Sequence, residues 1–378
     1  MASQHGKGRQ FLSEVSQTRD ERTGARVWQV TNQACINHNL YFLTSSFTPD
    51  GRGLIFASNR SGKTDFYRAG FPKGAITQLT DGEGIAGHSG VISGDGRRLY
   101  YTAGGAVRSL ELEEPCETTL AEFAGASLGE VSPSGDGRWL VCAAKLGGQN
   151  HIAVVGTDGS GGRLIHQQDR TIIHPQFNPI DSDWIEFASD PAPRMFLIRR
   201  DGTGLTCLYE HGNEEFVVHE TWLGRTGDLV FTVWPKSLKR LALPSRQVVT
   251  IADFNAWHIA PTRDGRKILC DTNHPDVGLQ LVDVATGQRK TICHPGSSNS
   301  GTQWRTSRYA LKEDFERAAR EGASHRGQAL SWMEMNVDTV YGPQWTHPHP
   351  SFGPDERLVC FTSDRTGHPQ VYVAEISE

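Results

Sequence analysis

Short apolar runs recur along the chain, and each of them follows a polar turn. The clearest turns are Asp50-Gly51, Asp95-Gly96, Asp136-Gly137 and Asp264-Gly265. Asp and Gly both tolerate the positive φ that a tight turn between two strands requires. The pattern therefore predicts short β-strands joined by hairpins.

Less regular copies of the same unit lie at 179–181, 227–228 and 354–355, so the unit occurs seven times. Most copies are about 40 to 45 residues apart, which is the length of four short strands in one blade of a β-propeller. A further strand pattern at 26–31 precedes the first turn, whereas the last unit ends after Ala374 without a closing strand. We therefore expect an all-β fold, a seven-bladed β-propeller whose N-terminal strand completes the last blade and protects its sheet edge.

The longest interval between copies lies between Cys293 and Gln344, where the chain contains a polar insertion. Residues 309–321 have a helical pattern that ends at Gly322. Loops of this length are often lids or partner surfaces, although an insertion that only packs on one face is an equal alternative. The sequence predicts a single propeller domain over residues 1–378 with a partly helical insertion at about 296–343.

Composition agrees with this architecture and narrows the classes of function. The 378 residues include 41 Gly and 9 Trp but only 4 Met, which suits many turns and few helices. The 38 basic and 43 acidic residues give a net charge of -5, so there is no basic excess to bind nucleic acid or an anionic membrane. Neither an apolar leader nor a spanning run of about 18 apolar residues is present, so we expect a cytoplasmic protein. The sequence leaves the oligomeric state open.

The 7 cysteines lie far apart and include no Cys-x-x-Cys pair. Such a set does not form a disulfide framework or a thiolate zinc site, so we expect buried free thiols. A hydrolase-like Gly-x-Ser-x-Gly pattern occurs at 125–129, but it falls inside a propeller repeat, where the strand-turn-helix elbow of such enzymes is not expected.

Candidate chemistry gathers at one phase of the repeat. Six of the 15 histidines lie roughly six to nine residues before the turn of their unit. They are His88, His174, His219, His258, His347 and His349. This phase corresponds to the innermost strand of a blade, and innermost strands line the central channel. One such histidine is more often a structural residue, but several at one phase predict imidazoles that meet at one end of the channel.

The segment 344–350, with the sequence QWTHPHP, has the densest chemistry. In a strand, residues i and i+2 point to the same side, so His347 and His349 can bind one ion. Gln344 can add an amide oxygen, and His258 from the neighbouring blade can add a third imidazole. This mixed set suits a divalent ion such as Mn²⁺ better than a closed structural zinc site. The alternative is a histidine pair packed between flanking aromatic rings.

These residues resemble the oligogalacturonate lyases, a family of cytoplasmic seven-bladed propeller enzymes of pectin breakdown. The similarity is most specific at 344–352, 219–222 and 194–197, and weaker similarity extends over most of the chain. The resemblance implies that Gln344, His347, His349 and His258 hold Mn²⁺, that His219 is the catalytic base, and that Arg194 lies beside it at the substrate. We also expect His88 and His174 to contact the substrate.

The implied reaction is β-elimination at a 4-linked uronate, in which short oligogalacturonates give 4,5-unsaturated galacturonate products. The segment 189–193, before Arg194, lacks the histidine-containing acidic loop that the family has there. Two alternatives stay open. One is a lyase for a different uronate oligosaccharide, and the other is a non-enzymatic propeller that acts as a protein-binding platform and needs no convergent histidines.

Overall fold

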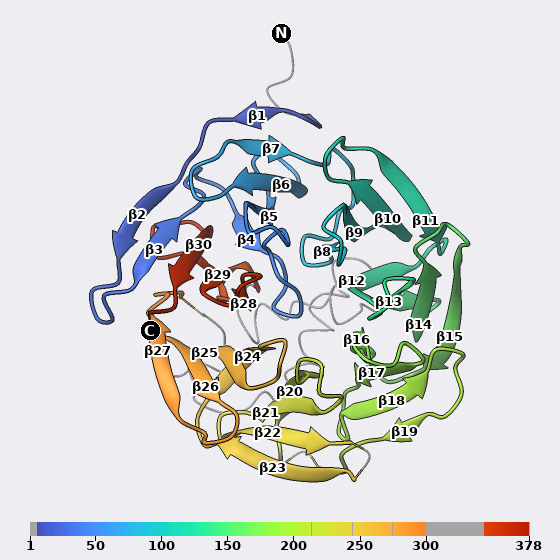
Figure 1. Ribbon diagram of the computed structural model, residues 1–378. Coiled ribbons are helices and arrows are strands. Elements are labelled where there is room, and N and C mark those ends of the chain that lie inside the picture. Colours follow the sequence, from blue (N-terminus) through green and yellow to red (C-terminus); the bar gives the residue numbers. More distant parts are fainter. Residues whose placement is uncertain (1–5, 213, 244, 274, 299–343, 378) are drawn as a thin grey trace, which may run out of the picture.

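The computed structural model describes residues 6–212, 214–243, 245–273, 275–298 and 344–377. Within these residues, seven antiparallel sheets are arranged in a ring around a central axis (Figure 1). The expected seven-bladed β-propeller is therefore confirmed. The expected insertion at about 296–343, including the helical pattern at 309–321, lies almost wholly outside the described residues and stays a prediction.

Each sheet forms one blade, in which the strands follow one another from the axis outward. Blade 1 has β4 (Asn37–Asn39), β5 (Gly53–Ser58), β6 (Asp65–Gly70) and β7 (Ile76–Gln78), and blade 2 has β8 (Val91–Ile92), β9 (Arg98–Ala103), β10 (Ala106–Glu111) and β11 (Glu117–Glu122). Blade 3 has β12 (Ser127–Pro133), β13 (Trp139–Leu146), β14 (Gln149–Gly156) and β15 (Gly162–Gln168), and blade 4 has β16 (Ile173–Phe177), β17 (Trp184–Ala188), β18 (Met195–Arg199) and β19 (Thr206–Cys207). Blade 5 has β20 (Val217–Trp222), β21 (Leu229–Val233), β22 (Ser237–Ala242) and β23 (Gln247–Ala252), and blade 6 has β24 (Ala256–Pro261), β25 (Lys267–Thr272), β26 (Leu279–Asp283) and β27 (Arg289–Cys293). Blade 7 follows the 3-10 helix η1 (Gln344–Thr346) and has β28 (Ser351–Phe352), β29 (Leu358–Ser363) and β30 (Gln370–Glu375).

The N-terminal part of the chain closes the ring, as expected. Strand β3 (Arg26–Gln29) pairs antiparallel with β30, and Trp28 lies opposite Val373 (Figure 1). Strand β2 (Ser16–Arg19) then covers the outer edge of β3, and β1 (Gln10–Phe11) covers β7. These pairings protect edges that would otherwise expose backbone N–H and C=O groups.

The predicted turns join the innermost strand of a blade to the second strand. In blade 1, the carboxylate of Asp50 accepts hydrogen bonds from the Thr48 hydroxyl at 2.6 Å and the Arg52 amide at 3.0 Å. Gly51 completes the turn with a φ of 68°. The same carboxylate arrangement recurs at Asp95, Asp136 and Asp264. The repeat seen in the sequence is thus a repeated hydrogen-bonded turn.

Apolar side chains pack between neighbouring blades in seven clusters. In one of them, Val141 and Val154 of blade 3 share a buried cluster with Ile172 and Phe187 from the blade 4 segment. Burial of each such side chain contributes about 1.5 to 3 kcal/mol. A ring of small cores therefore replaces one large core, which lets a chain of this length fold around one axis.

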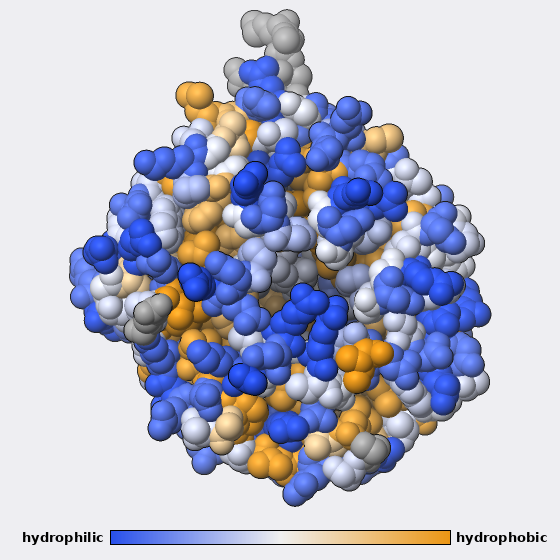
Figure 2. All heavy atoms as spheres, in the orientation of Figure 1, coloured by the Kyte–Doolittle hydropathy of each residue, from blue (hydrophilic) through white to orange (hydrophobic). Residues whose placement is uncertain are grey.

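The surface of one face is mostly hydrophilic with scattered apolar side chains (Figure 2). No helix in the described parts of the chain is long and apolar enough to cross a membrane. All seven cysteines are free thiols, as expected. The expectation that they are buried is right for four of them, whereas Cys35 and Cys207 are only partly buried. It is wrong for Cys116, which is exposed because it lies next to β11, the outermost strand of its blade.

A histidine-rich candidate active site

The innermost strands bring the predicted histidines together at the axis. Three of the six lie on these strands, namely His174 in β16, His219 in β20 and His258 in β24. The other three, His88, His347 and His349, lie in the segments just before β8 and β28. The expectation of innermost strands is therefore right for three of them and displaced by a few residues for the rest.

An irregularity in the inner strands turns the side chains toward one another. The pairing of β16 with β17 shifts after Ile173, and the pairing of β20 with β21 shifts after Val218. The next residues, His174 and His219, have φ values of 51° and 54°, and His349 has 43°. Positive φ is unusual for residues with a side chain, and bulges of this kind re-aim a side chain next to functional sites. A shared backbone feature thus explains why these three histidines converge.

Three imidazoles form a compact buried cluster. One ring nitrogen from each of His258, His347 and His349 lies within 4.8 Å of the other two. The rings of His258 and His349 are only 4.0 Å apart between centroids. This spacing is compatible with one metal ion bound by all three.

The two histidines of segment 344–350 meet for a different reason from the one expected. They do not lie in a strand, because η1 and a bend precede β28, which begins only at Ser351. Pro348 and Pro350 have no N–H to donate, so this segment cannot pair regularly in a sheet. The rings of His347 and His349 are nevertheless stacked at 5.8 Å. The side chain of Gln344 lies outside the described part of the chain, and its role as a ligand stays a prediction.

A buried carboxylate orients the central imidazole of this cluster. Asp271, on β25, accepts a hydrogen bond from the His258 backbone amide, and its other oxygen lies 2.7 Å from Nδ1 of the same histidine. This contact assigns the proton to Nδ1 and leaves Nε2 with a lone pair. Burial also lowers the pKa of His258 and His349 well below the usual value, so both rings are neutral. Neutral imidazoles are the form that binds metal.

Among the described residues, Nε2 of His349 is buried without a hydrogen-bond partner. An orphaned buried nitrogen of this kind needs a physical explanation. A divalent ion held by three imidazoles would satisfy it, so the donor set fits a divalent transition metal.

His219 lies beside this cluster, with its ring 4.4 Å from that of His258 and 4.3 Å from that of Trp257. Burial, and then the neighbouring His258, lower its pKa well below the usual value. Its Nδ1 has no hydrogen-bond partner in the described parts of the chain. His219 is therefore a neutral imidazole with a nitrogen available to accept a proton.

Arg194 is joined to His219 through the next residue in the chain. Its Nε donates to Oε2 of Glu220 at 2.9 Å, and its Nη2 lies 3.4 Å from Oε1. Burial alone would raise the pKa of Glu220, but Arg194 lowers it below the usual value, so the carboxylate is ionised. The backbone N–H of Arg194 donates to Nε2 of His211 at 3.0 Å. The positive charge is thus held rigidly next to the candidate base.

His174 and His88, the two residues that we expect to contact the substrate, differ in their surroundings. Both ring nitrogens of His174 are engaged, Nδ1 with Glu220 at 3.0 Å and Nε2 with the Tyr41 hydroxyl at 2.9 Å. His88 stacks on His38 at 4.2 Å and lines a small hollow with Tyr41 and other residues. Their roles toward a substrate stay predictions.

Sequence reasoning missed Tyr41 and Phe42, which lie in the segment between β4 and the turn of blade 1. The Phe42 ring is 5.0 Å from that of His258 and 5.4 Å from that of His219. It also missed His38, because the additional residues after β4 place this histidine farther from its turn than the others. The long interval before Asp50 is the signal that could have revealed all three.

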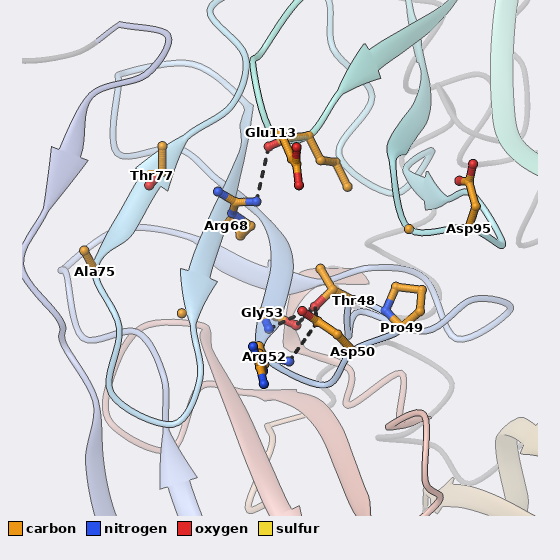
Figure 3. Close-up of a pocket in the computed structure, with 13 residues that line it drawn as sticks. Thr48, Pro49, Asp50, Arg52, Gly53, Arg68, Ala75, Thr77, Asp95 and Glu113 are labelled. Carbon is orange, nitrogen blue, oxygen red and sulfur yellow. Dashed lines mark hydrogen bonds between the residues drawn. The ribbon is translucent and has the colours of Figure 1, made fainter.

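The Gly-x-Ser-x-Gly pattern leads to no hydrolase site, since Ser127 begins β12 and no helix follows. A separate open hollow of about 660 Å³ lies between blades 1 and 2 at their Asp-Gly turns (Figure 3). Its walls include Asp50, Arg68 and Asp95, and Arg68 already donates to the Leu112 carbonyl. None of the predicted site residues lines it.

Comparison with known proteins agrees with the resemblance seen in the sequence. Residues 5–123 match the family model described as oligogalacturonate lyase. An oligogalacturonide lyase of Pectobacterium atrosepticum is 24% identical over 95% of both chains, and an oligogalacturonate lyase of Dickeya dadantii is 23% identical over 98% of both. The resemblance is therefore confirmed over nearly the whole chain.

Two solved structures have the same fold. One is an oligogalacturonate lyase in complex with manganese, with a TM-score of 0.82, and the other is an oligogalacturonate lyase from Vibrio parahaemolyticus, with a TM-score of 0.79. Each is 21% identical to this chain, and each match covers 99% of both compared chains.

Proposed function

We propose that this protein is an oligogalacturonate lyase, which cleaves short oligogalacturonates by β-elimination and releases 4,5-unsaturated galacturonate during pectin breakdown. The observation that carries the proposal is that a candidate metal-binding cluster and a candidate base lie next to each other near the central axis. A cluster of three imidazoles lies beside His219, whose ring is 4.4 Å from His258. The names of the relatives indicate the substrate class. A cytoplasmic location, which the family resemblance implies, belongs to the same proposal.

We assign the metal to His258, His347 and His349, with Gln344 as an additional ligand. Imidazole and amide oxygen donors suit Mn²⁺, and a solved relative contains manganese. When bound there, the ion would supply Lewis-acid stabilisation of the negative charge that develops on the uronate carboxylate.

His219 takes the proton from C5 of the uronate at a ring nitrogen. Its neutral form is the one that accepts a proton, and burial keeps it neutral at cytoplasmic pH. Arg194 adds a fixed positive charge beside the base, where charge moves toward an enolate. The electrons of the C5–H bond form the C4–C5 double bond as the C4–oxygen bond breaks. The leaving oxygen then takes a proton from water or from the His219 imidazolium.

The reaction is tested with purified protein and a panel of uronic-acid oligomers that includes digalacturonate and trigalacturonate. We expect a rise in ultraviolet absorbance from the unsaturated product with the galacturonates. Preference for another uronide would instead support the alternative substrate class. A protein that cleaves none of them would favour a protein-binding propeller.

The metal is tested on the same protein by thorough chelation and readdition of Mn²⁺. We expect activity to disappear and then return. Activity that survives chelation would remove the metal from the reaction.

A further inference from the structure

Arg194 is held by two carboxylates that differ strongly in exposure. The side chain of Glu220 is 0% exposed, whereas that of Asp190 is 36% exposed. Asp190 places both of its oxygens near Nη1 of the arginine, at 2.9 and 3.0 Å. The fully buried pair with Glu220 is lost only at high cost, whereas a pair with one partner exposed to water is weaker. Glu220 is therefore the permanent partner of Arg194, and Asp190 is the partner that a ligand can replace.

The edges of the guanidinium group show which binding position Asp190 occupies. A guanidinium has five N–H donors in a planar fork and binds a carboxylate best along one edge with two parallel hydrogen bonds. Glu220 occupies the edge formed by Nε and Nη2. The remaining edge is formed by Nη1 and Nη2, and Asp190 already contacts Nη1. A substrate carboxylate can therefore bind Arg194 by two hydrogen bonds only after Asp190 has left.

The backbone around Asp190 is anchored, so its departure needs only a side-chain rotation. Its amide donates to the Thr171 hydroxyl at 2.7 Å, and the Ser189 amide donates to the Arg194 carbonyl at 2.8 Å. Arg170 donates to the carbonyl of Pro193 at 2.5 Å and also to that of Pro191. Rotation about the side-chain bonds of an exposed residue is fast and requires no loop movement.

We propose that Asp190 is a specificity-determining residue that competes with the uronate carboxylate of the substrate for Arg194. This inference rests on the proposed function. In the free enzyme, Asp190 neutralises the outer edge of the guanidinium group. An arriving substrate carboxylate displaces Asp190 and takes its hydrogen bonds, whereas an uncharged sugar gains too little to do so. Asp190 thus lowers the affinity for carboxylates at this position, leaves the affinity for uncharged sugars almost unchanged, and so sets the margin by which the site prefers an acid.

The test is steady-state kinetics of Asp190→Asn and Asp190→Ala with digalacturonate. Loss of a solvated ion pair is worth about a two- to fivefold change in affinity, so we expect KM to fall by that factor while kcat changes little. Asp183→Asn is the matched control, because Asp183 pairs with Arg200 at 2.9 Å in the same blade and is more exposed. Its KM should equal that of the wild type.

A second measurement separates charge from packing. Calorimetry in a His219→Ala background, which does not consume the ligand, compares digalacturonate with its methyl ester. We expect loss of Asp190 to tighten binding of the free acid, since the competitor is gone, to leave binding of the ester almost unchanged, and so to increase the preference for the free acid over the ester. Alanine and asparagine give the same direction if the removed charge is the cause.

A KM that is unchanged or higher in both variants of an active enzyme would overturn the proposal and make Asp190 an anchor for Arg194. A preference for the free acid that does not increase on loss of Asp190 would overturn it as well. Failure of the proposed function appears differently, as a wild-type protein that cleaves none of the uronides, and it would overturn both proposals.

Discussion

Blades 5 and 6 both have a register shift in the innermost strand, but the residues at the shift differ in chemistry. These residues are His219 and Glu220 in blade 5, and Trp257 and His258 in blade 6. In blade 6, the carboxylate of Asp271 contacts His258 and orients its ring toward the imidazole cluster. In blade 5, the carboxylate of Glu220 contacts Arg194 and His174, and Nδ1 of His219 has no partner among the described residues.

This difference in the location of the carboxylate is the physical basis for the different roles that we propose for the two histidines. A carboxylate that accepts from Nδ1 fixes the tautomer and makes the ring a good ligand. A carboxylate that instead pairs with an arginine leaves the neighbouring ring free to accept a proton. In the proposed function, the two blades therefore form a metal-binding side and a proton-accepting side of one site, and each can be changed separately.

The largest expected effect comes from the proton-accepting side. His219→Ala should lower kcat for digalacturonate by about 10²- to 10⁴-fold, which is the usual contribution of a general base. Its metal content should equal that of the wild type when measured by elemental analysis. Near-normal turnover with metal bound would remove His219 from the base role.

On the metal side, Asp271→Asn should weaken metal binding by about 10- to 100-fold, because the carboxylate that orients His258 is lost. Titration with Mn²⁺ should show activity that recovers at higher concentrations. A variant that binds metal as tightly as the wild type would show that Asp271 does not orient this ligand. The contrast with His219→Ala, which added metal should not rescue, separates the two sides.

An intermediate effect is expected from Glu220→Gln, which leaves the buried Arg194 without its permanent partner. Removal of one partner of a buried pair costs about 3 to 5 kcal/mol, so the midpoint of thermal unfolding should fall. KM should rise because Arg194 is no longer held, and metal affinity should be unchanged. A change in metal affinity equal to that of Asp271→Asn would contradict the separation of the two sides.

The smallest effect is expected far from the site, at the ring closure. Asp20 accepts hydrogen bonds from the amides of Thr23 and His294, and so links the turn between β2 and β3 to the end of blade 6. Asp20→Asn should lower the free energy of unfolding by about 1 to 2 kcal/mol, without altering kcat or metal affinity.

The stabilisation of the folded state by Asp20 depends on pH in a defined direction. Burial opposes ionisation of Asp20, but its hydrogen bonds lower its pKa from 3.8 to about 2. Because the folded-state pKa is lowered, the stabilisation is complete above about pH 4 and is lost as the pH falls through about 2. Denaturant titrations of wild type and Asp20→Asn should therefore converge only in acid. A constant difference at all pH values would contradict the role of the charge.

The turns and the closing strand could be predicted because each depends on residues close in sequence. Asp50 needs only Thr48 and Arg52 to form its turn, and the strand at 26–29 is recognised by its own pattern. The histidines could be found because they recur at one phase of the repeat. Asp271 could not, since an aspartate that contacts a residue in another strand has no local signal.

Amino-acid order alone determined the number of blades, the position of the turns and the family resemblance, because a repeated local hydrogen-bonding pattern is visible in a one-dimensional string. Tertiary structure decided which carboxylate contacts which ring. Positive φ at His174, His219 and His349 turns these side chains inward, and ring closure pairs the N-terminal strand β3 with β30 of the last blade. Contacts between residues that are distant in sequence depend on this geometry. They distinguish histidines that look alike in sequence, which the proposed function assigns to metal binding or to proton transfer.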